Sequence, residues 1–292
     1  MGRTRGSPPV RERSGPCASR VTPSGERERG VGSRLGPRDR SVLAALVVGG
    51  DEALTLDQLA EAVWGAEPPV SWRKVVHGCV ARLRRALGPG SVETVATGYR
   101  LAVAADEIDA RRFGLLLRRC REQLDLGAPD RALFLVDEAL ALWRGRPLAD
   151  VESWEPGRTE AGRLTESRLD AQELRLEAAL RAGRHVEILA EAQARADEAP
   201  LRERRWALLA RAQYRCGQQS ESLASLRRVR ALLHAELGVD PGAELVGLER
   251  AILRHRVAAR RRSGAGQAAR RRRAPGRRPG STGRPRAGTR AR

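Results

Sequence analysis

Apolar residues recur every three or four positions from residue 37 to residue 254, which predicts a protein that is mainly α-helical. Gly and Pro residues separate the successive apolar segments. The first elements are expected to be three helices followed by a β-hairpin. The helices should cover 37–49, 55–65 and 71–87, and the strands 91–95 and 99–103. Thr55 should begin the second helix as its N-cap, and Gly65 should end it. This order of elements is that of a winged helix-turn-helix.

The third helix is the part of this section most suited to a ligand. Pro68 and Pro69 prevent an earlier start, and the Ser71 hydroxyl is expected to cap the first turn. Its apolar stripe consists of Val76, Cys79, Val80, Leu83 and Leu87. The opposite face holds Lys74, His77, Gly78, Ala81 and Arg85, with Arg82 and Arg84 at its edges. A cationic face with small central residues suits a nucleic-acid groove, and an ordinary amphipathic surface helix is the alternative.

The rest of the patterned chain is expected to be helical throughout. Its helices should cover 109–126, 130–143, 157–182, 185–199, 202–216, 219–237 and 242–254. The triplets Ala182-Gly183-Arg184 and Cys216-Gly217-Gln218 lie 34 residues apart, which is the period of tetratricopeptide (TPR) repeats. We therefore expect a short TPR-like solenoid of stacked helix pairs, with a plain helical bundle as the alternative.

Composition places the basic charge at the two ends of the chain. Residues 1–40 carry ten Arg and four acids, and residues 255–292 carry fourteen Arg and no acid. Of the net charge of +19, residues 41–254 therefore hold −1, so the total does not by itself indicate nucleic-acid binding by the folded part. Residues 1–34 are expected to be a disordered or degenerate arm and residues 255–292 a disordered Arg-rich tail. That tail is either a truncated or frame-shifted end or a genuine basic arm.

Several classes of chemistry lack their signatures. The four cysteines form no C-x-x-C pair, and the four histidines have no metal-ligand spacing, so we expect neither a metal nor a cofactor. No G-x-S-x-G motif is present, and we expect no enzyme. Three of the cysteines fall in apolar helical patterns, which indicates reduced thiols and a cytoplasmic protein. No apolar run is long enough to span a membrane.

Separated motifs now resemble a known family. The first section resembles an OmpR/PhoB-type winged helix in residues 35–46, 59–65, 80–88 and 98–101. The second resembles the bacterial transcriptional activator domain (BTAD) in residues 109–113, 139–148, 182–185, 200–206 and 236–242. Together they resemble SARP-type transcriptional regulators, with a winged-helix domain at 35–105 and a BTAD at 106–254. That family normally has a small sheet before the first helix, which residues 1–34 hardly supply. A nucleotide-binding domain, present in larger relatives, is not expected, because the only lysine, Lys74, is not in a P-loop motif.

The resemblance implies a DNA-binding transcriptional activator. Its third helix would read the major groove, its wing would touch the DNA backbone, and its helical domain would serve dimerisation and activation. By position, Lys74, His77 and Ala81 would face bases, and Arg73, Arg84 and Arg85 would face phosphates. Thr97 and Arg100 would lie at the wing. The implied partners are promoter direct repeats in double-stranded DNA and a second copy of the chain, with RNA polymerase as a further candidate.

Two other functions remain open from the sequence. The first is a helical protein-interaction scaffold, or a truncated regulator, that does not bind DNA specifically. The second is non-specific nucleic-acid binding through the basic ends.

Overall fold

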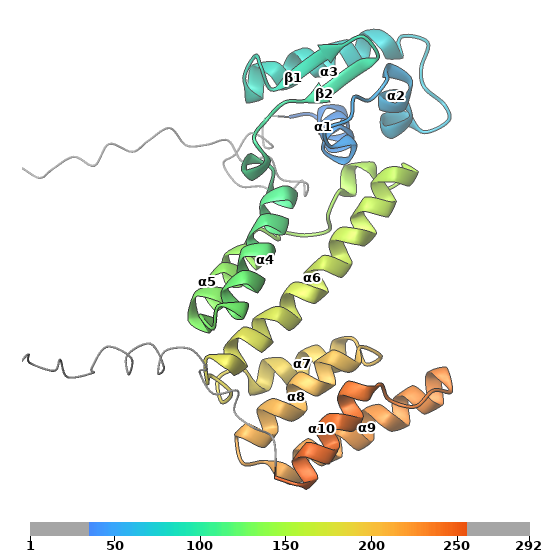
Figure 1. The fold of residues 1–292 in the computed structure, drawn as a ribbon. Helices are drawn as coiled ribbons and strands as arrows, with labels where there is room; N and C mark the ends of the chain where they lie inside the picture. The colour runs from blue at the N-terminus through green and yellow to red at the C-terminus, as the bar shows by residue number, and fades with distance from the viewer. Residues whose placement is uncertain (1–34, 256–292) are drawn as a thin grey trace, which may run out of the picture. The chain divides into compact units, whose positions relative to one another are not determined.

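The computed structural model describes residues 35–255 (Figure 1). The expectations for residues 1–34 and 256–292, including the N-terminal sheet, lie outside the described residues. The first section consists of α1 (Pro37–Gly49), α2 (Leu56–Trp64), α3 (Trp72–Leu87), β1 (Val92–Val95) and β2 (Gly98–Leu101). The second consists of η2 (Ala105–Glu107), α4 (Asp109–Asp125), α5 (Pro129–Leu140), η3 (Ala149–Val151), α6 (Glu155–Arg181), α7 (Leu189–Glu198), α8 (Glu203–Arg215), α9 (Gln219–Leu237) and α10 (Ala243–Leu253). The mainly α architecture, a winged helix followed by a helical domain, is confirmed.

The limits of α2 follow from the residues at its ends. The Gln58 amide N–H donates to Thr55 Oγ1 at 3.2 Å, and the Thr55 N–H donates to Gln58 Oε1 at 2.9 Å. This reciprocal capping box satisfies two N–H groups that a helix start leaves free. Gly65 ends the helix at φ 66°, a left-handed conformation that glycine adopts without steric cost. Both predicted limits of this helix are confirmed.

The start of α3 differs from the prediction. Ser71 precedes the helix, but its hydroxyl makes no capping hydrogen bond. Its backbone, at φ −89° and ψ 12°, is not extended as a cap residue usually is, because the chain already turns there. The Trp72 N–H donates to the Pro69 carbonyl at 2.9 Å within that turn. The expectation that Ser71 caps α3 is therefore wrong.

The predicted hairpin is present and is paired on both sides of its second strand. β1 and β2 are antiparallel, with Val92 opposite Leu101 and Val95 opposite Gly98. On the other side of β2, Tyr99 exchanges two backbone hydrogen bonds with Leu54, at 2.8 and 2.9 Å. Tyr99 is thus fixed between two neighbouring chain segments. The second strand ends at Leu101, two residues before the predicted end.

Helix pairs make up the second section, and the same turn joins them. Gly127, Gly183 and Gly217 have φ 73°, 83° and 79°, and each follows the end of the first helix of a pair. After each glycine, the next N–H returns to a carbonyl five residues earlier, as in Arg184 to Ala179 and Gln218 to Gln213. The turns at Gly183 and Gly217 are those of the predicted 34-residue repeat. Gly127 lies in a third turn of the same kind, which was not part of the predicted repeat.

Two predicted helices have shorter limits in the structure. The segment 130–143 is helical only to Leu140, because Leu142 and Trp143 donate to carbonyls three residues back and so form tighter turns. The segment 185–199 becomes helical only at Leu189, after a turn whose N–H to O distances reach 3.4 and 3.5 Å. Turns of this kind preserve apolar spacing, so periodicity alone cannot separate them from helix.

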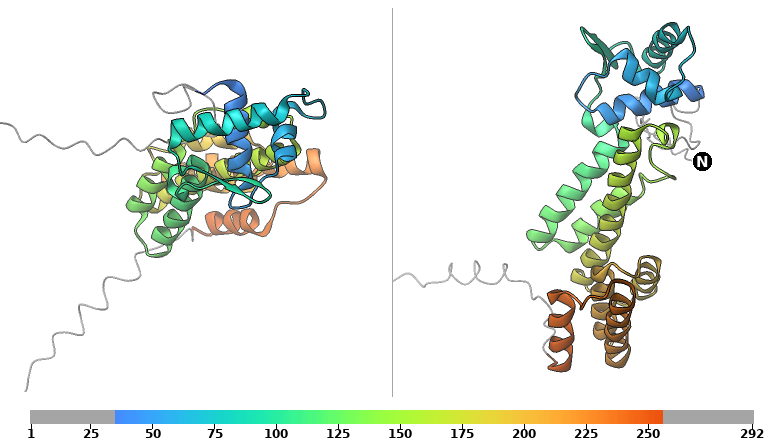
Figure 2. Two further views of the ribbon diagram at one scale, coloured as in Figure 1. Left: turned by 90° about the horizontal axis from the view of Figure 1, so that it is seen from above. Right: turned by 90° about the vertical axis from the view of Figure 1, so that its right-hand side faces the viewer.

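The core of the first section is completed by residues from the second. Leu148, Val151, Trp154 and Leu164 are buried in the same hydrophobic cluster as α1 and α3. At its edge, Arg40 Nε lies 3.1 Å from Asp150 Oδ1, and the Ser41 hydroxyl donates to the Asp150 carbonyl at 2.9 Å. The 27-residue helix α6 starts beside α1 and extends to α8 (Figure 2). The winged helix is therefore anchored to the helical section through apolar contacts.

Candidate nucleic-acid interface

One face of α3 is buried and the other is open to solvent. Val76, Cys79, Val80 and Leu83 are buried, as their spacing predicted, and Leu87, the last residue of the stripe, is partly buried. Of the predicted outward residues, Lys74, His77, Ala81 and Arg85 are exposed, whereas Gly78 is half-buried. Arg73, which the resemblance implied would face phosphates, is exposed as well. Ala81 is small and exposed, so the helix backbone can lie close to a ligand there. Gly78 has no side chain, but the Arg82 guanidinium lies 3.3 Å from the position that its Cβ would take. The open face thus combines positive charge with close approach.

Arg84 differs from the other predicted cations because the hairpin already binds it. Its Nε donates to the Val92 carbonyl at 2.8 Å, and its Nη2 donates to Thr94 Oγ1 at 2.8 Å. Its guanidinium also lies 5.8 Å from the centre of the Tyr99 ring. Arg84 therefore joins α3 to the hairpin, which holds the two elements in a fixed relation. Its contact with a phosphate remains a prediction.

The hairpin carries the two predicted wing residues. Thr97 is exposed in the turn between β1 and β2. Arg100 pairs across the strands with Glu93, with Nη2 and Oε2 2.6 Å apart. The hydrogen bond and the charge of Glu93 raise the pKa of Arg100. Both groups are exposed, so the pair contributes little to stability and leaves Arg100 able to exchange partners.

His77 and Tyr99 form a contact that the sequence did not predict. His77 Nδ1 lies 2.6 Å from the Tyr99 hydroxyl oxygen, and the two rings meet edge to face at 76°. Tyr99 is buried, with 7% of its surface exposed, whereas His77 is exposed. A residue predicted to face bases is thus held by a fixed residue of β2.

Asp39 and Arg82 form a second unpredicted contact, which joins α1 to α3. Arg82 Nη2 and Nε donate to the Asp39 carboxylate at 2.8 to 3.0 Å. Burial by itself would raise the pKa of Asp39, but hydrogen bonds from Arg82 outweigh burial and hold it below the ordinary value. Asp39 lies in the first turn of α1, where the helix dipole favours a carboxylate. The structure gives it a specific partner 43 residues away.

Acidic and basic side chains occupy different parts of the winged helix. Residues 41–72 contain no Lys or Arg but five exposed acids, Asp51, Glu52, Asp57, Glu61 and Glu67. Residues 68–92 contain no acid but five cations, Arg73, Lys74, Arg82, Arg84 and Arg85. The α3 side can therefore attract an anion even though the section as a whole is nearly neutral.

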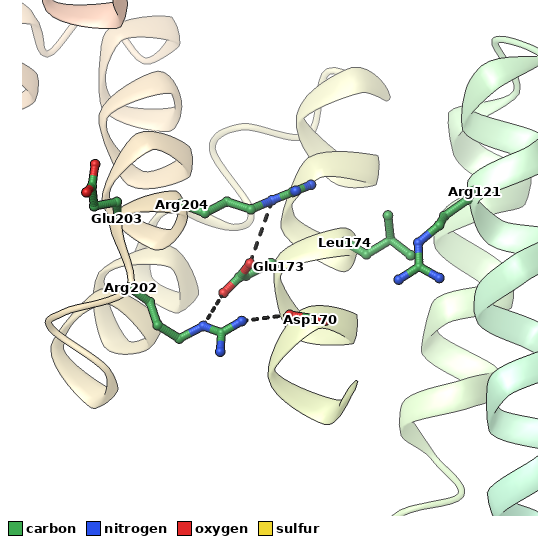
Figure 3. Close-up of a pocket in the computed structure, with 7 residues that line it drawn as sticks. All are labelled: Arg121, Asp170, Glu173, Leu174, Arg202, Glu203 and Arg204. Carbon is green, nitrogen blue, oxygen red and sulfur yellow. Dashed lines mark hydrogen bonds and ion pairs between the residues drawn. The ribbon is translucent and has the colours of Figure 1, made fainter. Parts of the chain in front are cut away.

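A pocket of about 440 Å³ lies in the helical section, between α4, α6 and the first turn of α8 (Figure 3). It is lined by Arg121, Asp170, Glu173, Leu174, Arg202, Glu203 and Arg204. Arg202 bonds Asp170 and Glu173 at 2.6 and 2.7 Å, and Arg204 lies 3.7 Å from Glu173. Arg202, just before α8, and Arg204 of α8 are thus paired with carboxylates of α6, which favours a structural role in joining the two helices.

Other kinds of site find little support in the described part of the chain. No three His, Cys, Asp or Glu residues within 35–255 are grouped so as to hold a metal ion. In the same range, no helix has both the length and the apolar character needed to cross a bilayer. Burial raises the pKa of the Cys79 and Cys120 thiols to about 11, and a protonated thiol is a poor nucleophile.

Comparisons with known proteins agree with this arrangement. Residues 30–101 match the family model "Transcriptional regulatory protein, C terminal", and residues 108–253 match "Bacterial transcriptional activator domain". AfsR of Streptomyces coelicolor is 38% identical over 221 residues, covering 74% of this chain but only 22% of AfsR. DnrI of Streptomyces peucetius is 32% identical over 228 residues, covering 74% of this chain and 84% of DnrI.

A solved structure has the same fold. It is Mycobacterium tuberculosis EmbR in complex with low affinity phosphopeptide, with a TM-score of 0.71 and 31% sequence identity. The likeness covers 77% of this chain and 61% of that chain. The fold and the matched models define a transcriptional regulator with a winged-helix DNA-binding domain and a bacterial transcriptional activator domain. The chain belongs to the SARP family of such regulators.

Proposed function

We propose that this protein activates transcription by binding promoter DNA, with α3 in the major groove. The observation that carries the proposal is the open face of α3, where cations and small residues lie together and no acid intervenes between residues 68 and 92. An α-helix fits the major groove of B-DNA, and small side chains allow its backbone to approach the bases. The proposal assigns residues 35–105 to DNA binding and residues 106–254 to the activator domain.

The predicted residues divide into two roles. Lys74, His77 and Ala81 lie along the middle of the exposed face and are proposed to contact base edges. Arg73, Arg84 and Arg85 are proposed to contact phosphates, with Thr97 and Arg100 touching the backbone from the wing. Phosphate contacts supply much of the affinity, whereas base contacts supply specificity. Lys74 can donate to guanine O6 or N7, and Ala81 can contact a thymine methyl group.

The helical domain is proposed to hold two copies of the chain on a direct repeat and to assist activation. The exposed acids of α2 and of the loop before α3 offer a surface to a basic partner such as a subunit of RNA polymerase. The chain spans only 22% of AfsR and 58% of EmbR of Mycobacterium tuberculosis, so activities of those longer proteins are not transferred to it. We propose that the protein acts in the cytoplasm and has no catalytic step.

Selection of bound sites from random double-stranded DNA tests the proposal. The full chain should enrich one sequence motif, as a direct repeat whose spacing reports the dimer geometry. On that motif, Lys74→Ala should weaken binding by about 1–3 kcal/mol and relax the preference at one base pair. Arg85→Ala should weaken binding to all sequences and lower the salt dependence by about one phosphate contact.

Arg131→Ala provides the matched control, because Arg131 is exposed on α5, away from α3. It should bind the motif like the parent. Helix content, measured by circular dichroism, should be the same in all variants. If the Lys74 and Arg85 variants protect the motif from nuclease like the parent, α3 is not the reading element. If no motif is enriched, specific DNA binding itself is refuted.

A further inference from the structure

We propose that Tyr99 fixes the imidazole of His77 so that its Nε2 presents an N–H donor to a guanine in the major groove. Tyr99 is then a positioning residue, and His77 reads one base pair. This inference rests on the proposed function, because it requires α3 to lie in the groove. It specifies that His77 acts as a hydrogen-bond donor in this contact and that Tyr99 determines this role.

Tyr99 is suited to this role because it is held from several sides. Its backbone pairs with Thr94 of β1 and exchanges two hydrogen bonds with Leu54. Arg84, itself bound to the Val92 carbonyl and to Thr94, lies over its ring. The phenol therefore has little freedom to follow a moving histidine. Its hydroxyl, 2.6 Å from His77 Nδ1, restrains the imidazole rather than the reverse.

The direction of this hydrogen bond decides what His77 can recognise. A neutral imidazole has one N–H donor and one acceptor nitrogen, and the partner of one nitrogen determines the role of the other. The phenol is the better proton donor of the two neutral groups, so the Tyr99 O–H donates to Nδ1. Nε2 then carries the hydrogen. His77 consequently offers a donor, and not an acceptor, on the open face of α3.

The surroundings of Nε2 favour a base over a phosphate. His77 lies between Lys74 and Ala81 in the middle of the exposed face, where the small side chain of Ala81 lets the helix approach the bases. Guanine presents two acceptors in the major groove, N7 and O6, whereas adenine presents one acceptor beside a donor. A single N–H donor held at a fixed angle therefore favours guanine. Cytosine, which presents an N4 donor, should be disfavoured.

The first experiment compares the motifs selected by the full-length parent and by His77→Ala. The parent should prefer guanine at one position, and this variant should lose that preference while the rest of the motif is unchanged. His234→Ala is the matched control, because His234 is exposed on α9. Uniform loss of affinity with an unchanged motif would show a phosphate contact and would overturn the proposal. A preference for cytosine at that position would overturn it as well.

The second experiment tests Tyr99. Tyr99→Phe keeps the buried ring and removes only the hydroxyl, so its melting temperature should stay close to that of the parent. Its guanine preference at the His77 position should fall, because the imidazole can then adopt either tautomer. Tyr214→Phe, the corresponding change at the other tyrosine of the chain, should select the parent motif. An unaltered preference in Tyr99→Phe would overturn the positioning role.

Replacing that guanine by 7-deazaguanine, which lacks N7, gives a direct chemical test. Parent binding should weaken about two- to tenfold, the usual value of one hydrogen bond, while binding of His77→Ala should not change. Equal weakening of both proteins would overturn the assignment. These outcomes are separate from failure of the proposed function, in which the parent would select no motif.

Discussion

Asp39 controls how firmly α3 is held against α1. Only 5% of this residue is exposed, and its carboxylate receives hydrogen bonds from the Arg82 guanidinium. Arg82 lies at the edge of the open face of α3, so the pair also orients that face. A carboxylate whose pKa is lowered in the folded state stabilises the fold above its unfolded pKa, and this contribution is lost as pH falls.

Asp39→Asn should therefore destabilise the protein by about 1.5–3 kcal/mol at pH 7, the range for a hydrogen bond to a charged group. The difference from the parent should shrink as pH falls below the ordinary carboxyl value of 3.8 toward the lower folded-state pKa of Asp39, because the unfolded parent then binds a proton that the folded carboxylate does not. Urea unfolding at pH 7 and near pH 3 measures both values. Asp57→Asn, at an exposed aspartate in the first turn of α2, is the matched control. An Asp39→Asn defect that is equal at the two pH values would contradict the ionic role.

Single residues were predictable from the sequence where their environment is local. The buried positions Val76, Cys79, Val80 and Leu83 follow from helical spacing, and Thr55 meets its partner Gln58 three residues later. Arg82 and Asp39, or His77 and Tyr99, meet only after folding, across 43 and 22 residues. Nothing in local spacing distinguishes such pairs, so the two contacts that hold the candidate site were missed.

The hairpin depends on close contact between β2 and the segment before α2. A Cβ atom added to Gly98 would lie 1.9 Å from the Leu54 carbonyl oxygen. The obstacle is backbone, which cannot move aside as a flexible side chain can. A side chain at Gly98 would thus separate β2 from Leu54 and shift Tyr99 with it.

Gly98→Ala should lower the free energy of unfolding by at least about 2 kcal/mol, which is large for one methyl group. Gly90→Ala is its control, because a Cβ there would meet nothing within 4 Å. The control should stay within about 0.5 kcal/mol of the parent in urea unfolding. Similar stability of the two variants would show that the contact between β2 and Leu54 can relax without cost.

The elements themselves were largely predictable, and their limits less so. Three helices and a hairpin could be predicted because apolar periodicity and Gly or Pro residues act within a few positions. The prediction that Ser71 caps α3 is wrong because the turn from Pro69 gives Ser71 a backbone conformation in which its hydroxyl makes no capping hydrogen bond. The C-terminal end of α5 and the start of α7 were predicted wrongly, because single turns keep the apolar spacing of a helix.

The two sections are expected to behave as one folding unit, because they share a hydrophobic core. Leu148 is fully buried in that core and comes from the segment between α5 and α6. This segment has no periodic pattern, and Leu148 has a left-handed backbone, φ 54°. Neither property can be inferred from residue spacing, so the sequence did not predict that this segment packs on α1.

Leu148→Ala should destabilise the protein by about 2–5 kcal/mol, as other Leu truncations in cores do. Because the lost contacts belong to the shared core, amide hydrogen exchange should become faster in α1 as well as around residue 148. Leu126→Ala removes the same atoms from a side chain that is 77% exposed, and it should leave exchange in α1 unchanged. If Leu148→Ala accelerates exchange only in the second section, the two sections fold independently.

Lys74, exposed at the centre of the open face of α3, is the only lysine of the 292 residues. All the other Lys and Arg positions are arginines. A guanidinium group reacts poorly with acylating reagents. A primary-amine reagent therefore finds one side chain in the protein, besides the terminal amine, and that side chain belongs to the proposed reading helix. The chain thus contains a single built-in chemical reporter of whether DNA covers α3.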